Sequence, residues 1–254
     1  LLELLKMDPH EFMDKYPREL SGGQRQRVGV ARALGADPPV LLMDEPFGAI
    51  DPITRVDLQN ELLKIQQEIR KTIIFVTHDI YEAIKMGDKI ALMNEGRLIQ
   101  HAPPADLLFR PKDEFVASFV GTDRALKGLQ LIRTQEVMKG DTPTVNADEN
   151  TAIAGERMKQ HGTDCLAVID AEERFKGWVR FSDLEKGDKV KGAMTTSVVT
   201  ASRYAVLSEA LSLMLTSGLN VLAIVDSSNR LEGVVTFESI QTALKEAVNM
   251  EPSP

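Results

Sequence analysis

The sequence has very little cysteine and lacks long apolar runs. Its 254 residues contain one cysteine, Cys165, so the chain cannot form an internal disulfide and suits a reducing compartment. Cys165 opens an apolar run that ends at Ile169, where we expect it to be a small buried hydrophobic residue rather than a reactive thiol. No apolar run approaches the ~20 residues that a membrane-spanning helix requires. We therefore expect any link to a membrane to depend on a partner.

Basic residues are not in excess either. Lys and Arg number 30 against 38 Asp and Glu, which gives a net charge of -8. Without a basic stripe to neutralise phosphates, the composition indicates no nucleic-acid partner. The sequence also contains no Gly-Lys dipeptide, so the phosphate-gripping loop Gly-x-x-x-x-Gly-Lys-Ser/Thr is missing from it. Because the chain opens at Leu1 within an amphipathic segment, we expect its natural N-terminus to lie upstream.

Residues 1–120 show an alternation of helical and strand patterns. Asp51 and Pro52 are suited to the cap and first position of one helix. We expect helices over 25–36, 53–70 and 79–86, buried parallel strands over 40–43 and 72–77, and a hairpin of strands 89–93 and 97–101. The pattern predicts part of a parallel α/β sheet.

A glycine-rich segment, Ser21-Gly22-Gly23-Gln24, precedes the first of these helices. The glycines let the backbone approach a ligand closely, and the hydroxyl and the helix N-terminus suit a γ-phosphate. Taken alone, such a segment would indicate only an ordinary helix cap.

Polar side chains follow both predicted parallel strands. Asp44 and Glu45 come directly after the first, and His78 follows the second. Ligands of open α/β sheets bind at this edge. Asp44 can hold Mg²⁺ through oxygen, Glu45 can polarise an attacking water, and His78 can contact a γ-phosphate. The alternative for the acidic pair is a solvated turn, which its position after a buried strand disfavours. The alternative for His78 is a structural histidine, which the preceding motifs disfavour.

An internal repeat occupies the second half of the chain. A shift of 56 residues aligns the sequence with itself without a gap, and it superposes Met138 on Met194, Gly162 on Gly218 and Phe181 on Phe237. Each unit has the pattern helix, strand, turn, strand, helix. One unit buries little apolar surface alone, so we expect the two to pack together as one module.

The order and spacing of the motifs in residues 1–120 resemble the nucleotide-binding domain of ABC transporters from its helical subdomain onward. The resemblance makes residues 20–24 the ABC signature, Asp44 the magnesium aspartate, Glu45 the catalytic glutamate, His78 the switch histidine and residues 48–51, ending at Asp51, the D-loop. It implies ATP and Mg²⁺ as cofactors. It also implies a homodimer with a second ATPase subunit, in which the signature of one subunit closes over the phosphate loop of the other.

Residues 135–247 resemble a tandem pair of CBS domains, whose usual nucleotide-contacting motif is Gly-h-h-Thr-x-x-Asp, where h is apolar. The first repeat keeps Asp183 but has Arg180 at the threonine position. The second keeps Thr236 but has Ser239 at the aspartate position. With Thr144 and Thr200, the residues Arg180, Asp183 and Thr236 are the candidate ligand contacts. The alternative is a dimerisation element that binds no ligand.

The fold prediction is therefore α/β: a partial P-loop NTPase (ABC ATPase) domain lacking the Walker A part, followed by an α+β tandem CBS pair. We expect the ABC portion over 1–122, a linker over 123–134, CBS repeats over 135–190 and 191–247, and a tail over 248–254.

An ABC ATPase followed by two CBS domains resembles the ATPase subunits of bacterial osmoprotectant importers for glycine betaine, carnitine, choline or proline betaine. The resemblance implies a peripheral position at the cytoplasmic face of the plasma membrane. It also implies permease subunits as partners and, through them, a substrate-binding protein. CBS control in this family responds to ionic strength or to cyclic di-AMP, and the acidic balance of residues 125–254 favours cyclic di-AMP.

Two other functions compete with the importer. One is a stand-alone CBS nucleotide-sensing regulatory protein with a vestigial ATPase part. The other is a non-transport ABC protein, which the acidic charge and the CBS pair disfavour. Because no Gly-Lys is present, we expect no measurable ATP hydrolysis from this chain alone.

Overall fold

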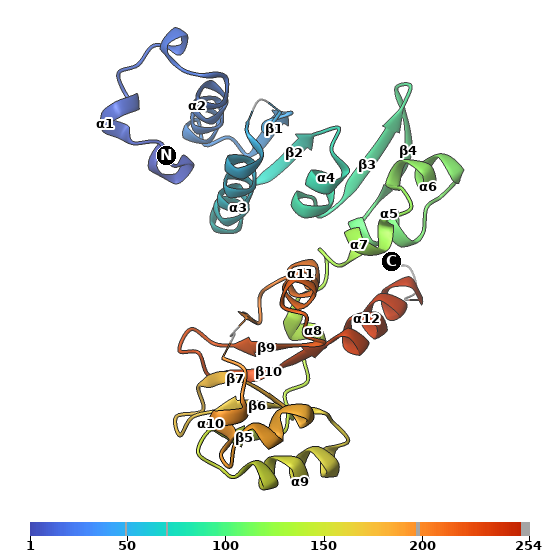
Figure 1. Ribbon diagram of the computed structural model, residues 1–254. Helices are drawn as coiled ribbons and strands as arrows, with labels where there is room; N and C mark the ends of the chain where they lie inside the picture. Colours follow the sequence, from blue (N-terminus) through green and yellow to red (C-terminus); the bar gives the residue numbers. More distant parts are fainter. Residues whose placement is uncertain (49, 70, 197–198, 250–254) are drawn as a thin grey trace. The chain divides into compact units, whose positions relative to one another are not determined.

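The computed structural model describes residues 1–48, 50–69, 71–196 and 199–249 (Figure 1). It divides into two compact units, Leu1–Ile90 and Ala91–Pro254. In the described part of the chain, no helix combines the length and the apolar character needed to cross a bilayer.

The first unit alternates helices with two paired strands. Its elements are η1 (Glu3–Leu5), α1 (Pro9–Phe12), η2 (Pro17–Glu19), α2 (Gly22–Gly35), β1 (Val40–Asp44), α3 (Pro52–Ile69), β2 (Thr72–Val76) and α4 (Ile80–Met86). The strands β1 and β2 pair in parallel, with Val40 opposite Thr72 and Asp44 opposite Val76. The structure thus confirms the expected alternation and the parallel pairing.

Side-chain caps explain where these helices begin. Oδ1 of Asp51 accepts a hydrogen bond from the Thr54 amide at 3.0 Å, and Pro52 is the first residue of α3, as predicted. Oδ1 of Asp79 accepts from the Tyr81 amide at 2.8 Å and caps α4. The helix α2 begins at Gly22, before the predicted residue 25, because the side chain of Ser21 caps it. Of the predicted helix 53–70, residue 70 lies outside the described residues.

The core of the first unit lies on one face of β1. Leu41 and Met43 are buried there against α2 and α3, together with Leu58 and Leu62. The opposite face of the two strands is exposed in the described residues, and the apolar residues on it are Val40, Leu42, Ile74 and Val76. Leu42 is 74% exposed. The two strands predicted as buried are therefore covered on one face only, because α2 and α3 pack on the same side.

The second unit opens with a hairpin and short helices. These are β3 (Ile90–Asn94, which starts in the first unit), β4 (Arg97–Ala102), α5 (Pro104–Phe109), α6 (Glu114–Val120), α7 (Arg124–Gly128) and α8 (Thr134–Val137). The turn residues Glu95 and Gly96 have φ of 48° and 74°, as a two-residue type I′ turn requires. The predicted hairpin is confirmed. The segment predicted as a linker, 123–134, contains α7.

The repeated region forms two sheets with the same topology. The first repeat contributes β5 (Thr144–Asn146), α9 (Thr151–His161), β6 (Cys165–Ile169), β7 (Phe175–Arg180) and η3 (Phe181–Lys186); the second contributes α10 (Val190–Ala193), β8 (Thr200–Ala201), α11 (Leu207–Ser217), β9 (Val221–Val225), β10 (Leu231–Thr236) and α12 (Phe237–Asn249). In each sheet the central strand is parallel to the first strand and antiparallel to the third. The two repeats differ at their ends, where the six-residue η3 corresponds to the 13-residue α12.

The segments that open the two repeats are exchanged between them. Lys139 and Val234 form two backbone hydrogen bonds, of 2.9 and 3.0 Å, and so do Thr195 and Trp178, at 2.7 and 3.3 Å. A shift of 56 residues takes Lys139 to Thr195 and Trp178 to Val234, so the two pairs occupy equivalent positions of the repeats. The opening segment of each repeat therefore pairs with the third strand of the other.

Two glycines make this exchange possible. A Cβ on Gly233 would lie 2.7 Å from the carbonyl oxygen of Lys139, and one on Gly177 would overlap the carbonyl oxygen of Thr195. The side chains between the sheets include Trp178, whose ring meets that of Phe175 edge-on at 5.3 Å. The repeats thus form one module with a shared core, as predicted.

Candidate functional site

The carboxyl ends of β1 and β2 bring together the acidic pair and the histidine identified from the sequence. Asp44 ends β1, Glu45 follows it, and His78 lies two residues beyond the end of β2. Oε1 of Glu45 lies 2.9 Å from Nδ1 of His78. The parallel register places these residues at one edge of the strand pair, which is where such sheets bind ligands.

The backbone of Glu45 adopts an unusual conformation. Its φ is +43°, in the left-handed region that non-glycine residues rarely occupy. Its amide donates to the carbonyl oxygen of Val76 at 2.9 Å. Its own carbonyl oxygen accepts from the amide of Gly48 at 3.1 Å and from the side-chain amide of Gln26. Hydrogen bonds on both sides of the residue therefore hold the strained conformation in place.

The charge of Glu45 alters the titration of His78. The hydrogen bond to Glu45, and then its negative charge, raise the pKa of His78 above its ordinary value, while Asp79 and Glu82 add smaller contributions in the same direction. The His78 side chain is 77% exposed, so solvent weakens each of these effects. A protonated imidazole at this position donates its Nδ1 proton to the carboxylate.

A polar network, partly buried, holds the loop that carries His78 (residues 77–79) against α3 and α4. The Thr77 hydroxyl donates to Oε2 of Glu82 at 2.7 Å and accepts from the Asp79 amide at 3.0 Å. Oε1 of Glu82 accepts from Nε2 of Gln59 at 3.3 Å, and Oε1 of Gln59 accepts from Nζ of Lys85 at 3.1 Å. Burial lowers the pKa of Lys85. The sequence pattern did not predict this network, although Gln59 is a polar residue beside the apolar positions Leu58 and Leu62.

The glycine-rich segment forms the start of α2. Oγ of Ser21 accepts from the Gln24 amide at 3.3 Å, and Oε1 of Gln24 accepts from the Ser21 amide at 2.8 Å. Gly22 and Gly23 are the first two helical residues. This reciprocal cap uses the Ser21 oxygen as an acceptor and leaves the hydroxyl hydrogen available to another acceptor such as a phosphate oxygen.

The D-loop residues lie between the site and α3. Ala49, within the segment 48–51, lies outside the described residues. The Asp51 carboxylate caps α3 through Thr54, and these hydrogen bonds lower the pKa of Asp51. The structure therefore gives Asp51 a helix-capping contact. The predicted contact with a nucleotide stays a prediction.

The fit of the site to Mg²⁺ depends on Asp44. Among the described residues, no group of three or more His, Cys, Asp or Glu side chains gathers to form a complete metal site. Asp44 is exposed at the end of β1 and offers one carboxylate. Mg²⁺ is usually held by one or two carboxylates together with substrate phosphates and water. Asp44 therefore fits the role of a single protein ligand in a site completed by a nucleotide.

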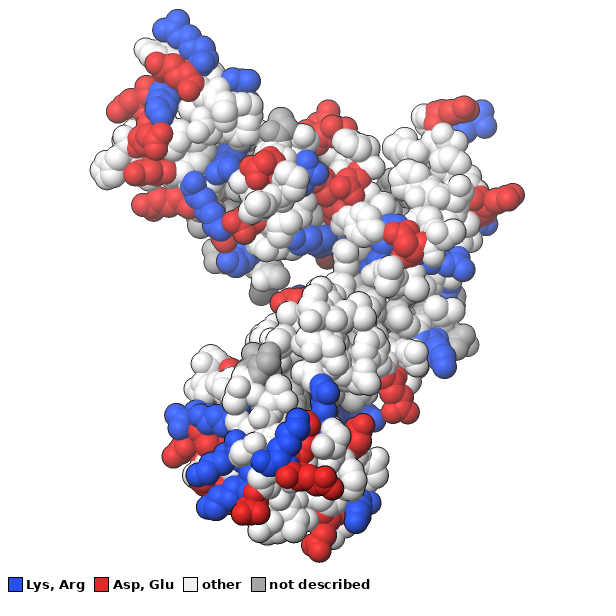
Figure 2. All heavy atoms as spheres, in the orientation of Figure 1, with Lys and Arg blue, Asp and Glu red and all other residues white. Residues whose placement is uncertain are grey.

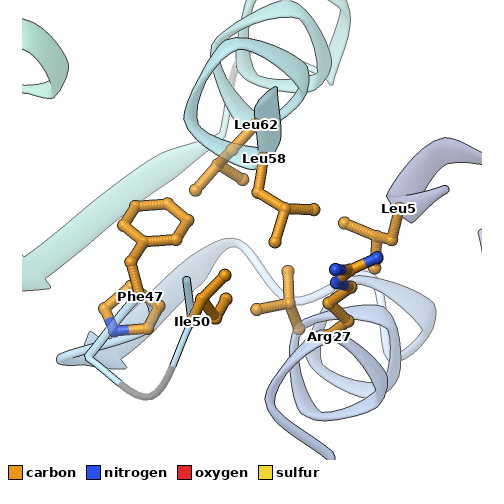
Figure 3. Close-up of a pocket in the computed structure, with 8 residues that line it drawn as sticks. Leu5, Arg27, Phe47, Ile50, Leu58 and Leu62 are labelled. Carbon is orange, nitrogen blue, oxygen red and sulfur yellow. The ribbon is translucent and has the colours of Figure 1, made fainter. Parts of the chain in front are cut away.

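A small pocket in the first unit lies beside this site but differs from it in character (Figure 3). Phe47 and Ile50, from the loop after β1, face Leu58 and Leu62 of α3 across it. Arg27 is its charged residue, and Nε of Arg27 is buried without a hydrogen-bond partner among the described residues. Most of these side chains belong to the core cluster, so we assign the pocket to packing rather than to ligand binding.

The candidate CBS contacts of the first repeat lie around its central strand. Thr144 on β5 pairs with Ala167 in the middle of β6, and Arg180 at the end of β7 pairs with Cys165 at the start of β6. Arg180 is exposed. Asp183 in η3 forms an ion pair of 2.6 Å with Lys186. Thr144 and Arg180 thus flank β6 from its two sides, and Asp183 lies beyond the end of β7 in η3.

The second repeat places its candidates in the equivalent way. Thr200 on β8 and Thr236 at the end of β10 border β9. The Thr236 hydroxyl accepts from the Ser239 amide at 3.1 Å, and the Ser239 hydroxyl accepts from the Thr236 amide at 3.0 Å. Thr236 thus caps α12, and Ser239, at the motif's aspartate position, completes the cap.

Charges of both signs are mixed on the face of the molecule in Figure 2. Lys and Arg side chains lie among Asp and Glu side chains there, and a large part of the same face carries neither. Opposite charges also form ion pairs in the repeated region, such as Arg174 with Asp170 at 2.8 Å within the first repeat and Lys191 with Asp148 at 3.1 Å between the two repeats. The mixed pattern on this face does not resemble the single-sign stripe of a nucleic-acid binder.

Family models match both parts of the chain. The model of the ABC transporter family matches residues 1–48, and that of the CBS domain matches residues 135–187 and 190–246. The chain is 41% identical over 245 residues to the glycine betaine/carnitine/choline transport ATP-binding protein OpuCA of Bacillus subtilis, which covers 94% of the chain. The chain is homologous to the ATP-binding proteins of ABC osmoprotectant transporters.

Other homologues are also ATP-binding proteins of transport systems. The osmoprotectant import ATP-binding protein OsmV of Salmonella typhimurium is 40% identical over 243 residues, or 94% of this chain. The choline transport ATP-binding protein OpuBA of Bacillus subtilis is also 40% identical over 94% of it. The chain spans 64% of the length of the OpuCA protein of Bacillus subtilis and 63% of OsmV.

Solved structures match the CBS region. A CBS domain pair/ACT domain protein from Thermotoga maritima is 27% identical, with a TM-score of 0.43, over 46% of this chain and 99% of that one. Staphylococcus aureus OpuCA is 20% identical, with a TM-score of 0.39, over 44% of this chain and 97% of that one. Together with the family models, the homologues confirm the predicted family and fold class, a partial ABC ATPase followed by two CBS domains.

Proposed function

We propose that the chain belongs to the ATP-hydrolysing subunit of an ABC importer for a quaternary ammonium osmoprotectant such as glycine betaine, carnitine, choline or proline betaine. The observation that carries this proposal is the 41% identity to OpuCA, which extends over 94% of the chain and so includes both the ABC part and the CBS repeats. The placement of Glu45 and His78 at one sheet edge supports it.

The chemistry of the proposed site follows from its side chains. ATP supplies the phosphoryl group to be cleaved, with Mg²⁺ held in part by Asp44. Glu45 acts as the general base that accepts a proton from an attacking water. His78 orients the Glu45 carboxylate through Nδ1. The bonds to Val76 and Gly48 hold the Glu45 backbone while the carboxylate acts.

The signature residues act on a second subunit in this proposal. Ser21, Gly22, Gly23 and Gln24 at the start of α2, and Asp51 in the D-loop, contact a nucleotide held by the partner of a homodimer. The 254 residues contain no Gly-Lys dipeptide, so neither site of a dimer of this chain would contain a phosphate loop. We therefore propose that the chain alone has no measurable ATPase activity.

Partners and location follow from the same proposal. The subunit would lie at the cytoplasmic face of the bacterial plasma membrane and contact permease subunits, which in turn receive substrate from a binding protein. The domain limits that we propose are 1–122 for the ABC portion, 123–134 for a linker, and 135–190 and 191–247 for the repeats. Of the proposed tail 248–254, residues 250–254 lie outside the described residues.

Regulation through the CBS module is the second part of the proposal. Thr144 and Arg180 flank β6, Thr200 and Thr236 flank β9 in the same way, and Asp183 follows β7 in η3. These residues offer hydroxyl, guanidinium and carboxylate groups. Cyclic di-AMP is the effector we propose, as an inhibitor of transport. Calorimetry of the whole chain with cyclic di-AMP tests this. Binding with micromolar affinity supports the effector, and no heat at high micromolar concentration overturns it.

Uptake in cells tests the main function. In a strain that lacks its own quaternary-amine uptake, the complete subunit and its membrane partners should support accumulation of radiolabelled glycine betaine, choline or carnitine at high osmolarity. Glu45→Gln should abolish this uptake. Glu156→Gln, on the exposed face of α9, is the matched control and should leave it intact. Uptake that survives Glu45→Gln contradicts the proposal.

The alternative is a stand-alone CBS nucleotide sensor with a vestigial ATPase part, in which the two CBS repeats carry the function. It predicts adenine-nucleotide binding by the chain and no effect of Glu45→Gln on uptake. The two experiments above therefore separate the two functions.

A further inference from the structure

We propose that Gln26 is a positioning residue for Glu45: its side-chain amide anchors the Glu45 main chain in the left-handed conformation that turns the carboxylate toward His78. The proposal concerns the same site as the proposed function, and its test by enzyme activity rests on that function. Its test by NMR titration does not rest on it, because the contact can be studied in the chain without nucleotide.

The contact joins two elements far apart in the sequence. Gln26 lies in α2, in the turn that follows the Ser21 cap. Its side-chain nitrogen Nε2 donates to the carbonyl oxygen of Glu45, 19 residues further along the chain. Few side chains in α2 can do this, because a helical residue reaches only the neighbour that its own face meets.

Glu45 needs such an anchor. A φ of +43° is disfavoured for a residue with a Cβ, so Glu45 would relax toward ordinary angles if its anchors were lost. The amide bond to Val76 fixes its N-terminal side, and the Gln26 and Gly48 bonds fix its C-terminal side. With the backbone in this left-handed conformation, Oε1 of Glu45 lies 2.9 Å from Nδ1 of His78.

The anchor has a consequence for coupling within the subunit. The helix that carries Gln26 begins with the capped segment Ser21 to Gln24. A shift of α2 relative to β1 would therefore pull on the Glu45 peptide through Gln26. Movement of the glycine-rich segment would therefore change the position of Glu45, as movement of the His78 loop would.

The titration of His78 reports on the contact. His78 is faced by Glu45 across the strand ends and by Asp79 and Glu82 from its own loop and α4. The last two residues remain in place when Gln26 is changed. A displaced Glu45 carboxylate would therefore reduce the upward shift of the His78 pKa without removing the other charges.

The experiment is an NMR titration of the histidine Cε1 protons of the chain and its variants. Gln26→Met keeps the length of the side chain and removes the donor. Gln67→Met, at an exposed position of α3, is the matched control. Glu45→Gln gives the full effect of losing the carboxylate. We expect Gln26→Met to lower the His78 pKa by more than half of the Glu45→Gln effect, and Gln67→Met to leave it unchanged.

An unchanged His78 pKa in folded Gln26→Met overturns the proposal. If Gln26→Met does not fold, Gln26→Ala, which suits a helix and also lacks the donor, is titrated in its place with the same two outcomes. In the complete transporter, Gln26→Met should lower kcat for ATP at least tenfold with little change in KM. A transporter in which even the unaltered subunit hydrolyses no ATP would contradict the proposed function and leave the titration result standing.

Discussion

Nδ1 of His78 lies 2.9 Å from Oε1 of Glu45, although 33 residues separate them in the sequence. The parallel register of β1 and β2 creates this relationship, because it places Asp44 opposite Val76 and so brings the residues after both strands to one edge. The pair is exposed, so a nucleotide, water or second subunit can reach it.

Glu45→Gln should lower the pKa of His78 toward its ordinary value of 6.5, because it removes both the charge and the strongest acceptor. The folded pKa is raised. The pair's contribution to stability is therefore fully present below the unfolded pKa near 6.5 and is lost as the pH rises through the folded pKa. NMR titration measures the first effect, and melting temperature against pH measures the second. A His78 pKa unaffected by the change would contradict the ion pair.

Gly233→Ala and Gly177→Ala should destabilise the CBS module by about 1–3 kcal/mol, the range of strain and overpacking effects. The added Cβ would press on the carbonyl of Lys139 or Thr195 and open the exchanged backbone pairs. Urea denaturation monitored by the fluorescence of Trp178 measures the loss. Gly192→Ala, in α10, places its Cβ no closer than 3.9 Å to its nearest neighbour and should change stability little. Equal stability of all three variants would show that the close approach is unimportant.

Cys165 should react slowly with thiol reagents in the folded protein. Burial raises the pKa of its thiol to about 12, and the nearby Asp164 adds to the shift, so almost no thiolate is present at neutral pH. The rate of reaction with a disulfide reagent should rise many-fold when urea unfolds the chain, and the folded rate should follow opening of the module. The sequence predicted a buried Cys165, and the structure makes it half-buried. Complete labelling within seconds at pH 7 would contradict its assignment as an unreactive thiol.

Thr77→Val should destabilise the first unit by about 1–3 kcal/mol, because it leaves Oε2 of Glu82 and the amide of Asp79 without this hydroxyl. Thr72→Val, at the exposed start of the same strand, is the control and should be nearly neutral. Chemical denaturation of both variants gives the comparison. If the two losses are equal, the network does not contribute to the stability of the His78 loop.

Much of the local structure could be predicted from the sequence. The caps at Asp51 and Asp79, the hairpin turn at Glu95-Gly96 and the 56-residue repeat all depend on residues close in sequence or on direct self-similarity. The proximity of Glu45 and His78 could also be predicted, because the carboxyl ends of neighbouring parallel strands lie at the same edge of a sheet.

The missed features depend on partners far apart in the sequence. The pattern of residues 40–43 shows that a strand is apolar, but it does not show which face a helix will cover, and Leu42 is exposed. The contact of Gln26 with Glu45 and the network around Glu82 depend on distances between elements, on which local periodicity is silent. The exchange of the opening segments could not be predicted for the same reason, because the sequence of a segment does not show which repeat it will pair with.

That exchange determines how the chain can be cut. A recombinant piece that ended between the repeats would keep Lys139 without its partner Val234, and Trp178 without Thr195. Such a half would expose an open strand edge, and a second copy could fill it by donating the same segment, which is the route to a domain-swapped dimer. Dissection experiments should therefore treat the two repeats as a single indivisible cassette, and the self-association of an excised repeat would reflect the missing half rather than a native interface.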